Sequence, residues 1–475
     1  MTIASIDPAT GRLLRTFAPL PEAEVAARLE LAATAYARHR RTSFAERAAR
    51  LYRVADFLDA ERERLARIAV REMGKPIGAA RAEVEKCAGG CRWYAEHAAA
   101  LLADEPIVGA RLPSTIVYLP LGPVLAVMPW NFPFWQVVRF AAPALMAGNV
   151  ALLKHASNVP QCALALEDLF LRAGFEAGVF QVLLIGGAAA AAVVADPRVA
   201  AVTLTGSEGA GAAIAAAAGR HLKKCVLELG GSDPFIVMPS ADVAAAAATG
   251  VTARALNNGQ SCINAKRFLV HDAVYDRFVT LLVDGLSRLR VGDPAAEDTE
   301  LGPLATEAAR SELERQVEAS VVAGARVLLG GRSRPGDGWF YEATVLADIP
   351  PQAPVAHEEV FGPVALVWRV HDLDEAIAVA NATPFGLGSS VWTADPVERE
   401  RCIREIEAGM TFVNGMVASD PRLPFGGVKR SGFGRELGAL GIREFTNVKT
   451  IVESDNDALC APGSESGDAS RRRAT

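Results

Sequence analysis

Hydrophobic residues recur along the chain with two different spacings. Between residues 21 and 70, leucine, valine, isoleucine and alanine return every three or four positions among arginines and glutamates, which predicts amphipathic helices. From about Val124 to Pro239, and again from about Lys266 to Asn414, short continuous apolar runs alternate with helical segments. Strands that are apolar throughout and alternate with helices are typical of a parallel sheet covered on both faces. The pattern therefore predicts an α/β protein with two parallel-sheet domains in tandem.

Individual strands are predicted at the apolar runs. In the first series these runs are VLAVM, VALLK, FQVLLI, AAVTL and PFIVM, and in the second they are RFLV, ARVLLG, VALVWRV, SSVW and TFVN. Two further stretches, STIVYLPLGP and FTNVKTIVE, predict extended strands outside these series. Residues 454–475 are small and polar without periodicity, so we expect a disordered tail.

Composition and charge exclude several classes of protein. Of the 475 residues, 51% are hydrophobic and 22% charged, as in ordinary globular proteins. The net charge of −6 argues against a partner such as nucleic acid or an anionic membrane. The longest uncharged stretch, residues 177–195, contains Gln181 and a Gly186-Gly187 pair, which predicts a strand, a turn and a helix rather than a membrane span.

Cysteine usage and the N-terminus indicate a cytoplasmic protein. The seven cysteines are irregularly spaced, so they do not form a disulfide framework and fit a reducing compartment. The first residues lack the basic and apolar regions of a signal peptide. Cys87 and Cys91 lie four residues apart on a predicted helix without histidine or acidic partners, so no metal site is expected.

Two residues have settings that suit covalent chemistry. Cys262 follows a long alanine-rich helical stretch in NNGQSC, and Gly259 is expected to end that helix. A thiol in such a connection is either a nucleophile or a small buried residue, and the motif alone leaves both open. Glu228, in VLELGG, is an acid within an otherwise apolar strand. If it is buried, its pKa rises toward the range of a general base, and the alternative is that it turns to solvent.

A possible binding face follows the motif PWNFP. Asn131, Trp135 and Arg139 are spaced by four residues and so share one side of a predicted helix. They present an amide, an aromatic wall and a cation, which suits a small substrate with an oxygen at one end and a carboxylate at the other. The alternative is a helix-capping asparagine, a core tryptophan and an arginine paired with a structural acid.

Two strand ends could bind a nucleotide. The segment Thr205–Gly211, TGSEGAG, follows a strand and opens a helix, where backbone amides bind phosphates, although it is not the GxGxxG pattern. Lys154 ends the strand VALLK, and the tips of parallel strands are where α/β sheets bind ligands.

Seven motifs together give the chain a family resemblance. PWNFP, LKHAS, LTGS, LELGG, GQSC, EEVFGP and PFGGVKRSG occur in this order within residues 5–453. In this respect the chain resembles the aldehyde dehydrogenase superfamily. The resemblance implies two Rossmann-like domains, a small β oligomerisation arm and a homodimer or homotetramer. It divides the chain into a cofactor-binding domain (1–101 and 121–229), a catalytic domain (230–435) and the arm (102–120 and 436–453).

The resemblance also implies roles for individual residues. Cys262 would attack the aldehyde, with the oxyanion held by its own N–H and the side-chain amide of Asn131. The thiohemiacetal would be oxidised to a thioester, and Glu228 would activate the water that hydrolyses it. Glu359 and Phe361 would position the nicotinamide ribose, Lys154 the adenosine ribose, and Gly206 and Ser207 the phosphates. The expected cofactor-binding residues are Trp130, Lys154, Ser157, Thr205, Gly206, Ser207, Glu359 and Phe361.

Within the superfamily, the region from PWNFP to LKHASNVPQ is similar to bacterial succinate-semialdehyde dehydrogenases. Arg139 would then bind the carboxylate of succinic semialdehyde and Ser419 would assist. The expected substrate-binding residues are Trp135, Arg139, Ser261 and Ser419, whereas the roles of Asp420 and Arg422 stay open.

The preferred cofactor follows from Ser157, which stands where relatives that use NAD have an acidic residue. The absent carboxylate predicts NADP, with NAD as the weaker alternative. Three other readings remain: a dehydrogenase of another small aldehyde, an acylating dehydrogenase that uses coenzyme A, and a non-catalytic protein of the same fold. The presence of Cys262, Glu228, Asn131 and Glu359 together argues against the last, and Glu228 argues against the second.

Overall fold

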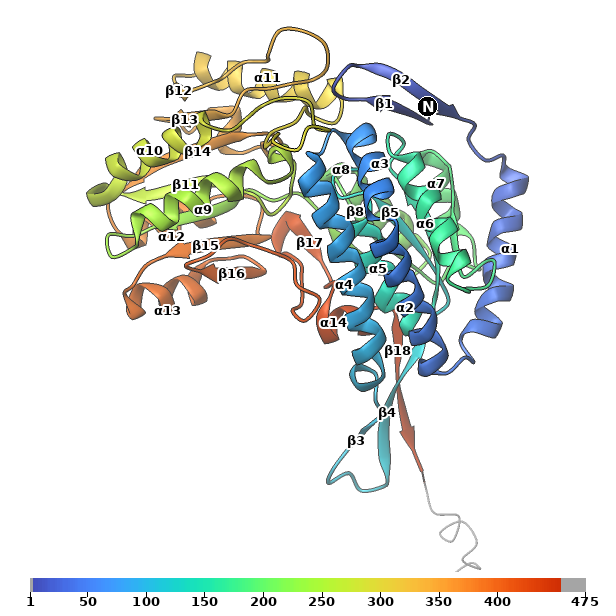
Figure 1. Ribbon diagram of the computed structural model, residues 1–475. Coiled ribbons are helices and arrows are strands. Elements are labelled where there is room, and N and C mark those ends of the chain that lie inside the picture. The colour runs from blue at the N-terminus through green and yellow to red at the C-terminus, as the bar shows by residue number, and fades with distance from the viewer. Residues whose placement is uncertain (1–2, 454–475) are drawn as a thin grey trace, which may run out of the picture.

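The computed structural model describes residues 3–453. The tail predicted to be disordered, residues 454–475, lies outside the described residues, and so does Cys460. The described chain contains two large sheets flanked by helices, a three-stranded sheet that projects from the body and a hairpin near the N-terminus (Figure 1). The predicted α/β class with parallel-sheet domains is confirmed.

The first large sheet has six strands and is parallel except for one short edge strand. The strand β5 (Pro123–Met128) lies near the middle of this sheet. The chain adds the next two strands on one side of β5 and the following two on the other side, so the strand order reverses there. Ligands of such sheets bind at this reversal, outside the carboxyl ends of the strands. The spatial order is β17 (Gly432–Phe433), β9 (Lys224–Glu228), β8 (Ala201–Thr205), β5 (Pro123–Met128), β6 (Val150–His155) and β7 (Phe180–Val182).

The second large sheet has seven strands and is parallel except for β12 at one edge. The apolar run PFIVM, which the sequence pattern groups with the first sheet, is β10 of this second sheet, and β13 has no counterpart among the predicted strands. The order is β12 (Arg326–Leu329), β13 (Thr344–Ala347), β14 (Val364–Val370), β11 (Ala265–His271), β10 (Asp233–Val237), β15 (Gly388–Trp392) and β16 (Met410–Val413).

Helices cover the sheets, and their ends follow local sequence signals. Ser43 and Glu46 form a reciprocal capping box at the start of α2, and Gly74 ends α3 in the left-handed conformation. The helices are α1 (Glu22–His39), α2 (Phe44–Ala60), α3 (Arg62–Met73), α4 (Ile77–Leu101), α5 (Trp135–Met146), α6 (Pro160–Arg172), α7 (Gly187–Ala195), α8 (Glu208–Arg220), α9 (Val243–Ala255), α10 (Asp272–Ser287), α11 (Glu307–Val322), α12 (Leu373–Asn381), α13 (Pro396–Glu405) and α14 (Gly438–Arg443). Within residues 3–453, no helix is long and apolar enough to cross a membrane.

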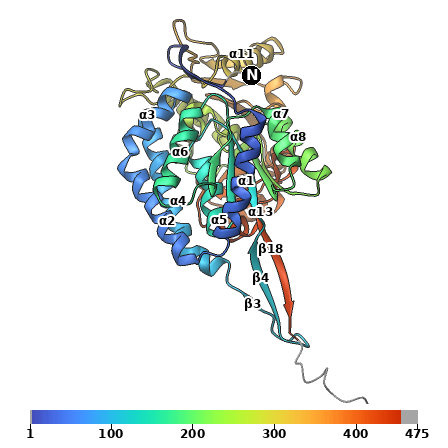
Figure 2. The same cartoon turned by 90° about the vertical axis from the view of Figure 1, so that its right-hand side faces the viewer.

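Two smaller sheets complete the fold. β4 (Ser114–Pro120) pairs antiparallel with β18 (Thr446–Val452) and with the short β3 (Glu105–Pro106), and together they extend away from the body in both views (Figures 1 and 2). These strands include both extended stretches predicted from the sequence. The hairpin of β1 (Ile3–Asp7) and β2 (Arg12–Phe17) precedes the helices predicted for residues 21–70 and has no counterpart among the predicted strands.

Candidate active site

The candidate site lies where the two large sheets meet. The first sheet contributes the carboxyl ends of β5, β8 and β9, and the second contributes the loops that precede β11 and β14. Between them is a cavity of about 280 Å³. Its walls are formed by Pro129, Trp130, Asn131, Gln136, Thr205, Gly206, Ser207, Leu229, Gly230, Cys262, Glu359 and Phe361.

The loop that carries Cys262 has an unusual backbone. Helix α9 ends at Ala255 rather than at Gly259, and a short 3₁₀ turn follows in which Asn257 and Asn258 have φ of 57° and 58°. Asparagine tolerates this conformation better than most residues. Gly259 also has positive φ, and a side chain there would collide with the backbone of Gly362. The loop geometry therefore depends on the residues NNG.

Asparagine side chains fix this loop to its surroundings. The Asn257 amide donates to the carbonyl oxygens of Asn131 at 2.7 Å and Gln260 at 3.0 Å. The Asn258 amide donates to Gly74 O and Pro303 O, both at 2.9 Å. The hydrogen bonds of these amide N–H groups hold the backbone before Cys262 in one conformation.

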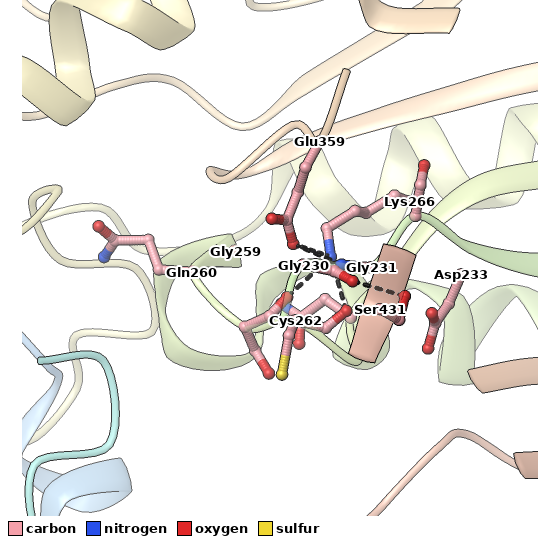
Figure 3. Close-up of polar contacts among 12 residues, drawn as sticks. Gly230, Gly231, Asp233, Gly259, Gln260, Cys262, Lys266, Glu359 and Ser431 are labelled. Atoms are coloured by element: carbon pink, nitrogen blue, oxygen red, sulfur yellow. Dashed lines mark hydrogen bonds and ion pairs between the residues drawn. The ribbon is translucent and has the colours of Figure 1, made fainter. Parts of the chain in front are cut away.

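Two buried cations, which the sequence analysis did not single out, support the same loop. The Arg254 guanidinium donates to Gly259 O and, at 2.6 Å, to Gly362 O. Lys266 Nζ donates to Ser261 O at 2.9 Å and to Cys262 O at 2.8 Å, and it pairs with Glu359 at 3.2 Å (Figure 3). The sequence could have indicated both residues, because each is a basic residue within an otherwise apolar helix or strand.

The environment of Cys262 keeps its thiol protonated at neutral pH. Burial raises the pKa of this thiol to about 12, while the positive charges of Lys266 and Arg139 act in the opposite direction. Because the thiolate is the nucleophilic form, the reaction requires a base that removes this proton.

Asn131 lies directly beside the cysteine loop. Its Nδ2 donates to Gln260 O at 3.0 Å, and its Oδ1 accepts from Gln136 Nε2 at 3.3 Å. One amide hydrogen is therefore left for a ligand in the cavity. The chain here is positioned by α4, because Glu83 Oε1 accepts from the backbone N–H groups of Phe134 and Trp135, both at 2.9 Å.

Glu228 ends β9 and is fully enclosed. Its carboxylate oxygens have no hydrogen-bond partner among residues 3–453, and a Cβ on Gly426 would lie 2.6 Å from Oε1. Burial, together with the neighbouring Glu436, raises the pKa of Glu228 well above its usual range, against the charges of Arg139 and Arg435. Glu228 does not line the cavity in this conformation.

Arg139, which the sequence analysis expects to bind the substrate carboxylate, is paired with an acidic residue of the protein. Its guanidinium forms a buried ion pair with Glu436 and donates to Gln136 Oε1 at 2.8 Å. It also contacts Thr205 Oγ1 at 3.3 Å and lies 4.6 Å from the Phe425 ring centre. The charge of Arg139 is thus compensated by a carboxylate of the protein itself.

The other residues expected at the substrate side occupy two places. Trp135 Nε1 donates to Ser419 Oγ at 3.1 Å, and Lys86 Nζ donates to the same oxygen at 2.7 Å. Ser261 is buried in the cysteine loop. Asp420 and Arg422 pair with each other, which holds the pKa of Asp420 below its usual value.

Several residues expected to bind the cofactor surround the cavity. Glu359 accepts from Gly231 N at 3.0 Å, and the rings of Trp130 and Phe361 meet edge to face at 5.8 Å. Ser207 caps α8, so the first N–H groups of that helix face the same region as Thr205 and Gly206.

Lys154 and Ser157 lie at and beyond the end of β6 and do not line the cavity. Burial lowers the pKa of Lys154, whose ammonium makes no hydrogen bond or salt bridge within the described chain. The Ser157 carbonyl accepts from Ala4 N at 3.0 Å. A free cation at the end of β6 and a helix N-terminus after β8, on either side of β5, fit the phosphates of a dinucleotide.

Comparison with known proteins identifies the family. The aldehyde dehydrogenase family matches residues 1–451. The chain belongs to the aldehyde dehydrogenase family. It is 57% identical over 454 residues to "Succinate-semialdehyde dehydrogenase [NADP(+)] 1" of Mycobacterium tuberculosis, covering 95% of this chain and 99% of that protein. It is 55% identical to the succinate-semialdehyde dehydrogenase [NADP(+)] of Mycobacterium avium, covering 95% and 96%.

Solved structures of other aldehyde dehydrogenases have the same fold. The succinic semialdehyde dehydrogenase of Streptococcus pyogenes in complex with NADP+ superposes with a TM-score of 0.93 at 38% identity, covering 95% of this chain and 100% of that one. A succinate-semialdehyde dehydrogenase from Burkholderia pseudomallei gives 0.91 at 36% identity, covering 95% and 94%. The family resemblance predicted from the seven motifs is therefore confirmed.

Proposed function

We propose that this aldehyde dehydrogenase oxidises succinic semialdehyde to succinate with NADP as the preferred cofactor. The observation that carries the proposal is the position of Cys262 in the wall of the cavity between the sheets, together with Asn131, Glu359 and Phe361. The relatives named above, which share more than half of their residues with this chain, support the choice of substrate and cofactor.

The reaction would begin with attack of Cys262 Sγ on the aldehyde carbon, while the thiol proton leaves to a base. The oxyanion would accept hydrogen bonds from the Cys262 N–H and from the unused Nδ2 hydrogen of Asn131. When bound, the nicotinamide accepts the hydride that converts the thiohemiacetal to a thioester. Water would then attack the thioester carbon, and succinate and the thiol would be released.

Glu228 is the proposed general base for the hydrolysis. Its raised pKa makes it a stronger base than an exposed carboxylate. Because its oxygens have no hydrogen-bond partner among the described residues, the side chain is free to accept a proton from a water molecule. From its present position near Gly426, it must turn toward the cavity to do so.

We propose that residues on both sides of the cavity bind the cofactor. Glu359, Phe361 and Trp130 would hold the nicotinamide end, and Thr205, Gly206 and Ser207 the phosphates. Lys154 and Ser157 would bind the adenosine ribose and its phosphate. A carboxylate at Ser157 would repel that phosphate, whereas the hydroxyl and the nearby Lys154 ammonium favour it.

The remaining assignments belong to the same proposal. We place the cofactor-binding domain at 1–101 and 121–229, the catalytic domain at 230–435 and an oligomerisation arm at 102–120 and 436–453. The exposed apolar side chains of Val448, Ile451 and Val452 on β18 suit pairing with a second copy in a homodimer or homotetramer. The six cysteines of the described chain are free, which fits the cytoplasm.

The test is a kinetic comparison of four reactions: succinic semialdehyde and butanal, each with NADP and with NAD. We expect the highest kcat/KM for succinic semialdehyde with NADP. Equal efficiency on butanal would indicate a dehydrogenase of another aldehyde, and a lack of turnover on both substrates would indicate a protein that has kept the fold without this activity.

A further inference from the structure

Lys86 is a cation whose charge no carboxylate neutralises. It lies on α4, half-buried, with its Nζ 2.7 Å from Ser419 Oγ and 4.7 Å from the Trp135 ring centre. Both contacts are uncharged. Within residues 3–453, Lys86 forms no salt bridge.

The charged groups that act on Lys86, namely Arg139, Glu83 and Asp420, are each already in an ion pair. Arg139 pairs with Glu436, Lys75 pairs with Glu83, and Arg422 pairs with Asp420. A partly buried charge is costly without a partner, because it has lost part of its hydration. Lys86 thus offers a position where an anionic ligand would supply the missing charge.

The hydrogen bonds around Ser419 define what kind of anion fits. Ser419 Oγ accepts from both Lys86 Nζ and Trp135 Nε1, so both of its lone pairs are used. Its own O–H donates to no acceptor among the described residues. Lys86 also keeps N–H groups beyond the one given to Ser419. A hydroxyl donor beside an ammonium donor matches the two oxygens of a carboxylate.

A short stretch of chain connects this pair to the loop that carries Cys262. Asn131 contacts the loop before Cys262, and Trp135 follows four residues later, where the chain already winds as a helix because Gln136 N donates to Phe132 O at 3.1 Å. Four residues along the chain therefore separate the amide that contacts the cysteine loop from the indole that contacts Ser419. Trp135 packs closely on α4, where a Cβ on Gly90 would lie 2.9 Å from its ring.

We infer that Lys86, together with the Ser419 hydroxyl, binds the distal carboxylate of the substrate and sets the preference for an anionic aldehyde. Arg139 then influences the site through its charge, while direct recognition of the carboxylate belongs to Lys86. This inference rests on the proposed function, because it requires that the substrate carries a carboxylate.

The decisive experiment compares succinic semialdehyde with butanal in Lys86→Met. Loss of the charged hydrogen bonds should lower kcat/KM for succinic semialdehyde by about 10- to 100-fold, mainly through KM. The value for butanal should stay within about two-fold, because the neutral chain makes no such bond. Lys86→Arg should restore most of the preference, and Ser419→Ala should give a smaller selective loss. The matched control is Arg92→Met, which removes a cation from the same helix, where Arg92 pairs with Asp56 and Asp59.

The pH dependence gives a second readout that a purely structural role would not change. Burial and the charge of Arg139 lower the pKa of Lys86 to about 8, while Glu83, Cys87 and Asp420 act in the opposite direction. The ammonium is present below this pKa and is lost above it. The ratio of kcat/KM for succinic semialdehyde to that for butanal should therefore be constant below about pH 8 and fall above it. Lys86→Met should remove this break.

The outcomes separate the two proposals. If the wild-type enzyme does not prefer succinic semialdehyde over butanal, the proposed function fails. If the wild type does prefer it but Lys86→Met changes both substrates equally, or changes neither, the preference is real and the role of Lys86 is refuted.

Discussion

Arg139 and Glu436 form the clearest test of whether a buried ion pair supports the reaction from a distance. Arg139→Met would leave the Glu436 carboxylate buried without its cation, and Glu436→Gln would leave the Arg139 guanidinium buried without its anion. Both side chains are at most 5% exposed. Breaking a buried pair by removing one partner costs about 3–5 kcal/mol, whereas replacing both partners costs much less.

These energies predict a measurable pattern in thermal unfolding. A chain of this size has an unfolding entropy of about 1 kcal/mol/K, so each single variant should lower Tm by about 3–5 °C if the chain unfolds as one unit. The double variant should recover much of this loss. Losses that simply add in the double variant would show that the two residues are not coupled.

The same variants should move the pH profile in opposite directions. The charge of Arg139 lowers the pKa of Glu228, and Glu436 raises it. Because the base must be deprotonated, hydrolysis rises with pH through this pKa. Arg139→Met should shift that rise to higher pH and Glu436→Gln to lower pH, equally for succinic semialdehyde and butanal. A loss in Arg139→Met that is confined to succinic semialdehyde, without a change in Tm, would refute the reasoning and restore Arg139 as the carboxylate ligand.

Three further substitutions test the reaction and the cofactor. Cys262→Ala should abolish aldehyde oxidation but leave NADP affinity, measured by fluorescence titration, nearly unchanged, and substantial turnover would exclude this nucleophile. Glu228→Gln should slow hydrolysis more than acylation, giving a burst of reduced cofactor near the enzyme concentration, and an unchanged steady-state rate would exclude Glu228 as the essential base. Ser157→Glu should raise KM for NADP strongly and KM for NAD little, and an unchanged ratio would contradict the assignment of the ribose phosphate site.

The sequence predicts the fold class well because both large sheets are buried on both faces. Their strands therefore appear as continuous apolar runs, and the family motifs fix the order of the elements. The run PFIVM shows the limit of this approach. Only four residues separate β9 from β10, yet the chain crosses there from one sheet to the other through Gly230 and Gly231. Nothing in the apolar pattern marks that crossing.

The site could be predicted less completely than the fold. Cys262 and Asn131 are recognisable because they occur in local motifs, and the structure brings both to the cavity. The partner of Arg139 is not recognisable, because Glu436 lies far along the chain and no local motif connects it to Arg139. Helical spacing correctly places Trp135 and Arg139 on one helix, whereas Asn131 lies before its first residue. The spacing also does not reveal which of the three already has a partner.

Burial of the site shifts the pKa of both reacting groups in the same direction, and the two shifts oppose each other in a proton transfer between the groups. The same desolvation raises the pKa of the Cys262 thiol and that of the Glu228 carboxyl. Transfer of a proton from the thiol to a carboxylate in the same region, directly or through water, moves one negative charge from one buried position to another. The cost depends on the difference between the two pKa values, and burial raises both. What burial does demand is that Glu228 be ionised first, and the charges of Arg139 and Arg435 favour that state.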